Sequence, residues 1–367
     1  MANAHLPDDE DPLGRAEALI AAGKADEAVR LLERLHDAGR GGLLLQAARV
    51  RALIASGDAG KALAVAREAA ALYPSVATAI VTLGEAMLAN GHLATAIGEF
   101  QRALRLDPDF APARYLLGCA WLEAGEADKA AEAFDAMSDE DVPGLAAKRA
   151  EIEAMRTRPR SDARYVRHLF DQFSADYDAR MIGQLGYGAP QILRNLADLI
   201  GLLYRDPLVI LDLGCGTGLG GAAFFDLAVR LDGVDLSPAM VEKAKARGIY
   251  NDVRVGDIEA PANDSGYDLV IAADTLVYLG DLEPVLRAAA NALAPGGTFL
   301  FTVERKEGDG FELGPKRRWR HSETYLRAVA AATGFDIAGF LECSPRSEAG
   351  VPVEGYAVAL NLAEKVG

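Results

Sequence analysis

The sequence predicts two domains: a solenoid of paired helices, followed by a seven-stranded, mostly parallel β-sheet with helices on both faces. The solenoid is indicated by glycines and alanines that recur at a fixed interval through the first part of the chain. The sheet is indicated by short apolar runs that alternate with amphipathic helical patterns in the remainder. A chain of 367 residues also exceeds what one hydrophobic core usually supports, and it suits two.

The repeat has a period of 34 residues and is carried by two residue types in phase. Each glycine separates two helical patterns, and each alanine stands where two helices must approach closely. The period is that of the tetratricopeptide repeat, so the region resembles four such units stacked into a solenoid with a concave face. The first unit is the weakest, because its opening helix would begin in the acidic stretch 7–12. The repeating positions are Gly23, Gly57, Gly91 and Gly125 with Ala28, Ala62, Ala96 and Ala130.

A polar helix is expected to cover the open end of the last repeat, with Pro143 near its start. The stretch that follows, residues 157–163, combines proline, arginine and small polar residues, which is typical of a boundary. We therefore place the solenoid at residues 1–156 and the sheet domain at residues 157–367.

The first strand of the sheet domain runs into a glycine-dense turn, LVILDLGCGTGLG, at residues 208–220. An acidic residue, Asp235, ends the next apolar run, 21 residues after Gly214. A strand that stops at such a turn lets a cofactor lie against bare backbone, and the acid can bind a ribose. Taken alone, the turn is compatible with a nicotinamide, a flavin or S-adenosylmethionine.

The residues at the ends of the later strands narrow the choice among these three cofactors. Asp257 ends the third strand and can accept from an adenine amino group, with Ile258 beside it as an apolar wall. A fourth strand covers residues 267–274, and Pro295 with two glycines breaks the next helix before the fifth strand. A dinucleotide enzyme needs a pyrophosphate cradle and a second nucleotide half, for which the remaining length hardly suffices. The last two strands are expected to form an antiparallel hairpin at the sheet edge. We expect strands to begin near Val209, Leu231, Val253, Leu269, Thr298, Asp336 and Tyr356.

Residues 165–362 resemble the class I S-adenosylmethionine-dependent methyltransferases, which have a Rossmann-like sheet. The resemblance rests on LDLGCGTG, GVDLSPAMVEKA, GDI, YDLV and LAPGG, in this order. The segment FDQFSADYD resembles a group of bacterial predicted methyltransferases that carry tetratricopeptide repeats. The resemblance implies S-adenosylmethionine as the cofactor.

The same resemblance implies a role for each element of the cofactor site. The glycines would pass under the methionine part, Asp235 would bind the ribose, Asp257 would contact the adenine amino group, and Met240 would pack near the adenine. Asp212 would orient the amine of the cofactor, and Cys215 is expected to pack within the turn rather than act as a nucleophile. The cofactor-binding residues expected are Asp212, Gly214, Cys215, Gly216, Gly218, Asp235, Leu236, Met240, Asp257, Ile258 and Ala273.

Three segments are candidates for the substrate side, and one of them is the long connection before the last strand, residues 343–355. The aromatic segment 165–193 could fold over the cofactor as a lid formed by Phe170, Tyr177 and Arg180, although amphipathic helices that cover the sheet are the favoured interpretation for most of its aromatic residues. The basic loop 305–326 follows the fifth strand, where ligands bind in open α/β folds, although a solvated charged loop is the alternative. The candidate substrate-binding residues are Arg180, Arg318, Trp319 and Arg320.

A base is needed only if the methyl acceptor is a protonated hydroxyl or amine. His321 is then the candidate, because it is the only nearby side chain with a pKa in the neutral range. Tyr177 or Tyr278 would orient the acceptor.

Composition excludes several other functions. The formal charge is −16, with 16 basic and 25 acidic residues in 1–156 and 22 basic and 29 acidic residues in 157–367, so nucleic acid is not an expected partner. There is no signal-peptide pattern and no run of about 18 apolar residues, so we expect a cytoplasmic protein that does not bind membranes. The three cysteines are too scattered for a disulfide framework or a metal site.

Three functions remain open. The favoured one is methyl transfer to an oxygen or nitrogen of a small molecule or a protein, with the repeats docking a substrate or partner on their concave face. The alternative is a repeat scaffold whose methyltransferase fold senses the cofactor or is inactive. A nicotinamide oxidoreductase is the third. The sequence does not name the acceptor.

Overall fold

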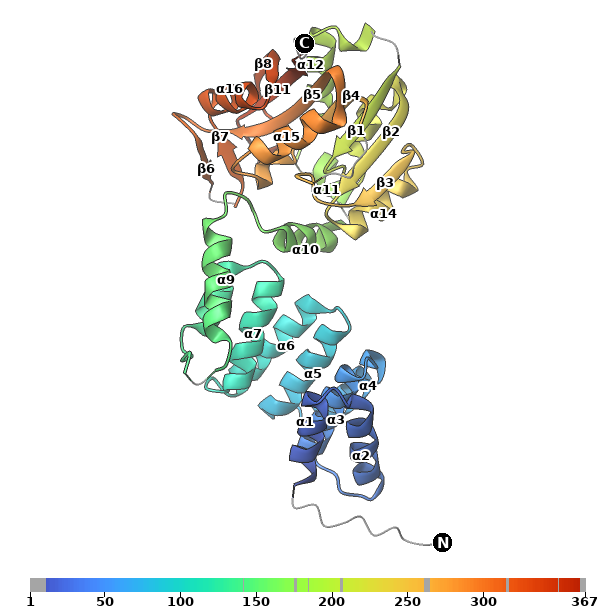
Figure 1. The fold of residues 1–367 in the computed structure, drawn as a ribbon, viewed down its shortest axis with the longest axis vertical. Coiled ribbons are helices and arrows are strands. Elements are labelled where there is room, and N and C mark those ends of the chain that lie inside the picture. Colours follow the sequence, from blue (N-terminus) through green and yellow to red (C-terminus); the bar gives the residue numbers. More distant parts are fainter. Residues whose placement is uncertain are drawn as a thin grey trace. The chain divides into compact units, whose positions relative to one another are not determined.

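The computed structural model describes residues 11–140, 142–174, 177–183, 185–204, 207–260, 265–314, 317–348 and 350–363, without the side chains of Arg180 and Ile182. The chain divides into two compact units, Met1–Arg156 and Thr157–Gly367 (Figure 1).

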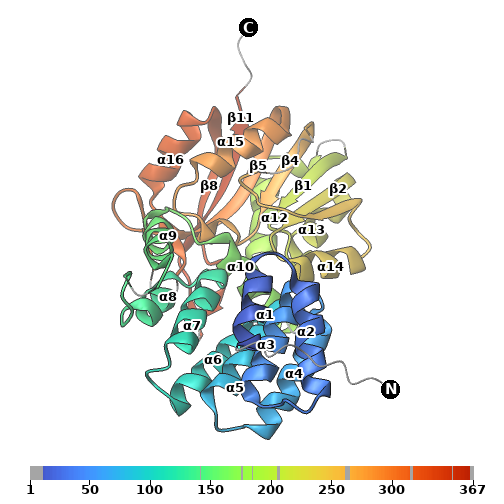
Figure 2. The ribbon, with the colours of Figure 1, turned by 60° about the horizontal axis from the view of Figure 1, so that its bottom comes forward.

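The first unit is a stack of helices in which each helix packs on its neighbours along the chain (Figure 2). All four glycines of the repeat have φ between +72° and +85°, the left-handed region that ends a helix and turns the chain. The predicted helical solenoid with tetratricopeptide-like repeats is therefore confirmed. The helices are α1 (Pro12–Ala21), α2 (Ala25–Asp37), α3 (Leu43–Ala55), α4 (Ala59–Leu72), α5 (Ala77–Ala89), α6 (Leu93–Leu106), α7 (Ala111–Glu123), α8 (Ala127–Phe134) and α9 (Leu145–Thr157).

Both ends of this stack bear on the sequence predictions. Helix α1 begins at Pro12, where the Asp11 side chain accepts a hydrogen bond from the backbone N–H of Gly14. The part of the acidic stretch before Asp11 lies outside the described residues. At the other end, α9 places Leu145 and Ile152 in an apolar cluster with residues of α7 and α8, so this helix covers the last repeat.

A glycine inside the first helix of two repeats lets an aromatic ring of the second helix rest on bare backbone. A Cβ added to Gly84 in α5 would lie 2.4 Å from Cε1 of Phe100 in α6. The equivalent atom on Gly118 in α7 would lie 2.3 Å from Cε1 of Phe134 in α8. Both rings are buried, so neither has free space into which it can move.

Gly84→Ala is expected to destabilise the first unit by about 1–3 kcal/mol, because overpacking outweighs the gain in helix propensity. Gly98→Ala in α6 is the matched control, since its Cβ would meet no described atom within 4 Å and should stabilise the helix. Thermal unfolding of the full chain, followed by circular dichroism, measures both. A Gly84→Ala midpoint at or above that of the wild type would contradict this packing.

The second unit is a mostly parallel sheet whose strands follow the order β3-β2-β1-β4-β5-β11-β8. The first five of these strands are parallel, and β11 runs antiparallel to both β5 and β8. The predicted seven-stranded sheet is therefore confirmed, with a small β6–β7 hairpin added on β5. The strands are β1 (Leu208–Leu213), β2 (Ala228–Asp235), β3 (Asp252–Val255), β4 (Tyr267–Ala272), β5 (Leu293–Arg305), β6 (Phe311–Leu313), β7 (Trp319–His321), β8 (Phe335–Cys343) and β11 (Gly355–Leu362), with a separate pair β9 (Ser347–Glu348) and β10 (Val351–Pro352).

One strand start differs clearly from its prediction. Strand β5 begins at Leu293 rather than near Thr298, because Leu293 already pairs with Tyr267 of β4. The ladder is then interrupted and resumes where Leu269 pairs with Thr298. The predicted break at Pro295 therefore lies within the irregular first part of the strand.

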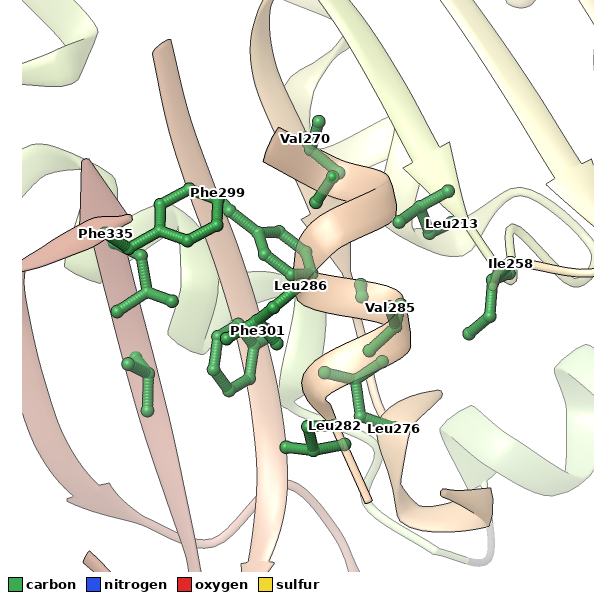
Figure 3. Close-up of a cluster of buried hydrophobic side chains, with 14 of the residues drawn as sticks. Leu213, Ile258, Val270, Leu276, Leu282, Val285, Leu286, Phe299, Phe301 and Phe335 are labelled. Carbon is green, nitrogen blue, oxygen red and sulfur yellow. The ribbon is translucent and has the colours of Figure 1, made fainter. Parts of the chain in front are cut away.

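Helices cover both faces of the sheet, and successive strand residues alternate between two apolar cores. On one face, Val285 and Leu286 of α15 and its N-cap residue Leu282 pack with Phe299 and Phe301 of β5 (Figure 3). The core of the other face includes apolar residues of α12 and α13. Because the strands are held on both faces, their carboxyl ends form a rigid edge. The helices of this unit are α10 (Ala163–Phe173), α11 (Tyr177–Gly183), α12 (Ala189–Leu199), α13 (Leu219–Phe224), α14 (Pro238–Ala246), α15 (Glu283–Ala292) and α16 (Glu323–Ala332).

Candidate active site

The glycine turn after β1 places bare backbone at the carboxyl edge of the sheet. Gly214 has φ +67°, and a Cβ there would lie 2.2 Å from Cγ2 of Thr275, so no side chain fits. Gly216 has φ +54°, and a Cβ there would meet no described atom within 4 Å, so its backbone borders open space. Gly218 has φ +91° and starts α13, with its Cβ direction toward Arg247.

A cavity lies against this turn. It gathers the ends of β1, β2 and β4 together with side chains from the aromatic segment. Among the predicted cofactor-binding residues it is lined by Asp212, Gly214, Cys215, Gly216, Asp235, Leu236, Asp257, Ile258 and Ala273.

Two predicted cofactor-binding residues do not line this cavity. The first is Gly218, where an added Cβ would lie 2.9 Å from Cδ of Arg247. Met240 is fully buried in the first turn of α14, where Ser237 caps the helix by accepting from the backbone N–H of Met240 at 3.1 Å. Met240 is therefore not a lining residue of this cavity, its packing near the adenine stays a prediction, and Leu236 provides the apolar wall from this segment.

Asp235 ties the glycine turn to α14. Its Oδ2 accepts from the backbone N–H of Gly216 at 2.9 Å, and its Oδ1 accepts from the backbone N–H of Ser237 at 2.8 Å. Burial raises the pKa of Asp235, while these two donors oppose the rise. A carboxylate has about four lone-pair sites, so Asp235 can accept two further hydrogen bonds from a ligand in the cavity.

Asp212 is the deepest carboxylate of the cavity, with an exposed fraction of 1%. Its Oδ2 accepts from the Tyr250 hydroxyl at 2.7 Å. Burial raises the pKa of Asp212 to about 7, although the Tyr250 hydrogen bond lowers it. The carboxylate therefore lies in an environment that a cationic ligand would stabilise.

Asp257 has a partner that the sequence did not suggest. Nη2 of Arg160 lies 3.0 Å from Oδ2 of Asp257, and Arg160 also pairs with Glu259. Arg160 belongs to the stretch that we interpreted as a boundary, yet it lines the cavity. The side chain of Asp257 is 30% exposed, so it remains accessible to a ligand.

The aromatic segment encloses the cavity through α10 and α11. Asp171 of α10 accepts from the Ser237 hydroxyl at 2.5 Å, and Asp178 of α11 pairs with Arg247 and the Thr217 hydroxyl. These polar contacts hold both helices against the glycine turn and α14. The apolar contribution of the segment includes Phe170, which lines the cavity.

A second cavity adjoins the first and shares part of its lining. Phe170, Tyr177, Asp274 and Tyr278 line both cavities, and the Phe170 ring packs edge-on against those of Tyr177 and Tyr278. Burial raises the pKa of both tyrosine hydroxyls, so they are neutral hydrogen-bonding groups at neutral pH. The remaining lining is Tyr165, Leu169, Phe173, Met181, Leu185, Arg318 and Glu348.

The predicted substrate-binding residues are separated by the structure. Arg318 lines the second cavity, with Nη1 3.3 Å from Oε1 of Glu348. Trp319 and Arg320 are not among the lining residues of either cavity in the part of the chain that the structure describes. Trp319 packs edge-on against Phe311, and Nε of Arg320 lies 3.5 Å from a Glu304 oxygen. The Arg180 side chain lies outside the described residues.

His321 does not face either cavity. It has no exposed surface, its Nε2 lies 3.0 Å from the Gly280 carbonyl oxygen, and its ring stacks on Tyr325. Burial lowers its pKa to about 4, so the ring is neutral at neutral pH. The structure contradicts the prediction of His321 as the base, because a buried ring outside both cavities cannot reach an acceptor.

Asp274 and Arg346 are the main polar residues that sequence reasoning did not single out, although Arg346 lies in the connection 343–355 that we named as a candidate for the substrate side. Asp274 lies at the end of the fourth strand, as Asp235 and Asp257 lie at the ends of theirs, so the same reasoning could have identified it. Arg346 lies in the connection before the last strand and belongs to no motif. It is fully buried and pairs with Asp274.

Metal sites and membrane-spanning helices can be assessed for the described residues only. No three His, Cys, Asp or Glu side chains among them are grouped as metal ligands. No described helix combines the length and apolar character that are needed to cross a membrane.

Family models match two parts of the chain: a methyltransferase domain at residues 211–301 and a tetratricopeptide repeat at residues 81–141. Ubiquinone biosynthesis O-methyltransferase of Xanthomonas campestris pv. campestris (strain B100) is 34% identical over 103 residues, which are 26% of this chain and 43% of that protein. A probable S-adenosylmethionine-dependent methyltransferase of Mycolicibacterium smegmatis is 28% identical over 133 residues, which are 35% of this chain and 52% of that protein. The chain thus spans about half the length of these curated relatives.

Among solved structures, magnesium protoporphyrin IX methyltransferase from Synechocystis PCC 6803 with bound S-adenosylmethionine is 19% identical, with a TM-score of 0.44 over 55% of this chain and 97% of that one. The family matches agree with the sheet order, the glycine turn and the strand-end acids. The second unit of the chain is therefore similar to S-adenosylmethionine-dependent methyltransferases, and the first unit to tetratricopeptide repeats.

Proposed function

We propose that this protein transfers a methyl group from S-adenosylmethionine in the first cavity to an oxygen or nitrogen of a small, largely apolar molecule in the second. The observation that carries the proposal is that the two cavities meet at a shared wall. A donor in the first cavity and an acceptor in the second would both lie beside the four residues that line both cavities.

The charges of the first cavity support this cofactor over one with phosphates. Its charged lining among the described residues is four aspartates and one arginine. The arginine, Arg160, is already paired with Asp257 and Glu259. Such a lining suits a cofactor with a sulfonium and an amine, whereas a pyrophosphate would be repelled.

The residues of this cavity fit the parts of the cofactor. Asp235 would hold the ribose hydroxyls and Asp257 the adenine amino group, with Leu236 and Ile258 as apolar walls. Asp212 would hold the amine, and the open backbone of Gly216 would lie under the methionine part. When bound, the cofactor supplies a methyl group that is already activated as a sulfonium. The protein chiefly aligns the acceptor with it, a contribution of roughly several kcal/mol.

The second cavity favours a small acceptor with an apolar body. Most of its lining is aromatic or aliphatic, with Arg318, Glu348 and Asp274 as polar groups. A hydroxyl acceptor agrees with the name of the relatives, ubiquinone biosynthesis O-methyltransferase.

For the repeats we propose a docking role toward a protein partner, since such solenoids present extended concave surfaces.

Calorimetric titration with S-adenosylmethionine and its demethylated product tests the cofactor site. Asp235→Asn is expected to weaken both affinities roughly tenfold to hundredfold, because a hydrogen bond to a charged group contributes about 1.5–3 kcal/mol. Asp252→Asn at the exposed start of β3 is the control and should bind as the wild type does.

Two results would overturn the proposal. The first is the absence of binding, or an affinity that Asp235→Asn leaves unchanged. The second is tight binding of a nicotinamide dinucleotide in the same cavity, which would favour the oxidoreductase. Binding of S-adenosylmethionine without methyl transfer to any acceptor would favour the scaffold alternative.

A further inference from the structure

Asp274 occupies an unusual position at the wall between the two cavities. It follows β4 with φ +56°, a conformation that a residue other than glycine adopts at an energetic cost. Its backbone N–H donates to Oγ1 of Thr302 at 2.8 Å, which fixes this conformation. The strained backbone directs a carboxylate to the place where the two cavities adjoin.

Arg346 holds one oxygen of this carboxylate. The Arg346 side chain has no exposed surface, and its Nη1 donates to Oδ1 of Asp274. Its Nη2 pairs with Glu304 and lies 3.2 Å from Oε1 of Glu348. Among the described residues, no recorded hydrogen bond reaches Oδ2 of Asp274, so this second oxygen is available to a ligand in the cavities.

Groups from several elements set the charge of Asp274. Burial raises the pKa of Asp274, Arg346 and Arg318 oppose the rise, and Glu304 and Glu348 add to it. Three neutral tyrosines also lie near it. The carboxylate is therefore more basic than one in water, while the arginine pair keeps it ionisable. The tyrosines are Tyr177, Tyr187 and Tyr278.

The other titratable groups of the second cavity are poorer bases. The tyrosines are neutral, and the guanidinium of Arg318 has donors but no acceptor. Glu348 is paired with both Arg346 and Arg318, and it lines the second cavity but not the first. Asp274 is the only described carboxylate that lines both cavities.

We propose that Asp274 binds the hydroxyl of a phenol-like acceptor and takes its proton during methyl transfer, with Arg346 as the positioning residue. The inference rests on the proposed methyltransferase function. The acceptor oxygen bonds to the methyl carbon as the carbon–sulfur bond breaks, and the electron pair of that bond stays on sulfur. The hydroxyl proton passes to Oδ2 of Asp274 and later leaves to solvent. A phenol fits because its ring suits the apolar lining and its hydroxyl needs a base at neutral pH.

The test uses the full chain, radiolabelled S-adenosylmethionine and three probes: catechol, 4-hydroxybenzoate and 1-naphthol. Asp274→Asn should bind the demethylated cofactor within about twofold of the wild type, while kcat/KM for a methylated probe falls roughly a hundredfold or more. The deficit should shrink as the pH approaches the pKa of the probe, because the phenol then ionises without help. Arg346→Lys should show a smaller loss and a displaced pH profile. Glu283→Gln, on the exposed side of α15, is the control.

The outcomes separate the inference from the proposed function. Failure of the wild type to bind S-adenosylmethionine would refute the methyltransferase assignment itself. Wild-type turnover by Asp274→Asn, or a deficit that does not change with pH, would overturn the role of Asp274 alone. If the wild type binds the cofactor and methylates no probe, the phenol-like acceptor is overturned.

Discussion

Replacing Arg346 with methionine is expected to destabilise the second unit by about 3–5 kcal/mol, because removal of one partner leaves buried charges without compensation. Arg346 has no exposed surface and neutralises Asp274 and Glu304, whose side chains are 8% and 6% exposed. Arg318 and Arg320 lie 3.8 Å and 3.5 Å from the nearest Glu304 oxygens, too far to replace its hydrogen bonds.

The deficit should depend on pH in a definite direction. Without Arg346, the folded-state pKa of Asp274, which burial already raises, rises further above its unfolded value. The folded state then binds more protons than the unfolded state, so the stability of the variant falls as the pH rises. Chemical unfolding at pH 5 and pH 8 should therefore show the larger deficit at pH 8.

Two variants make this test specific. Arg287→Met breaks an exposed pair with Glu283 in α15, and it should change the stability by less than about 1 kcal/mol. Glu304→Gln combined with Arg346→Met should recover part of the loss, because it removes one of the uncompensated charges. Equal stability of Arg346→Met and the wild type at pH 8 would show that the buried network contributes little.

The parts of the fold that were predicted correctly depend on local requirements. A helix that turns back at Gly57 needs a left-handed residue there, and the turn after β1, which passes beside Thr275, needs glycine at Gly214. Each of these local requirements fixes the residue type at one position of the sequence. Periodicity and glycine positions therefore predicted the repeats, the sheet and most of the first cavity.

The acceptor side could not be predicted in the same way, because tertiary contacts define it. Arg346 meets Asp274 across 72 positions of sequence and Glu304 across 42. The sequence showed a basic loop with a histidine, but it could not show that His321 turns inward against Tyr325 while Arg318 turns toward the cavity. The sequence shows which side chains are neighbours along the chain, but tertiary packing determines which of them reach a ligand.

The second large effect concerns Asp212. We expect its buried carboxylate, which we propose binds the amine of the cofactor, to lower the stability of the free protein. Its pKa rises from 3.8 to about 7 on folding. Between these values the folded state binds more protons than the unfolded state, so the stability falls as the pH rises and is lowest above pH 7. A shift of this size corresponds to at most about 4 kcal/mol, so Asp212→Asn should stabilise the free protein at pH 8 by up to that amount.

The same substitution should weaken the binding of the cofactor. The affinity of the wild type for S-adenosylmethionine should rise up to about tenfold per pH unit between pH 5 and 7, as Asp212 ionises, and binding in this window should release a proton. Asp212→Asn should bind roughly tenfold to hundredfold more weakly at pH 7, without this pH dependence. Calorimetry in two buffers of different ionisation enthalpy measures the proton, and thermal unfolding from pH 5 to 9 measures the stability.

Tyr250→Phe provides the matched variant, because it removes the hydrogen bond that lowers the pKa of Asp212 and keeps the ring. Its binding profile should shift to higher pH, whereas the profile of Asp212→Asn should become flat. If Asp212→Asn were no more stable than the wild type at pH 8 and bound the cofactor equally well, the buried carboxylate would have no part in binding. A stability gain coupled to an affinity loss, by contrast, would show that the strand end keeps an unfavourable charge because the cofactor neutralises it.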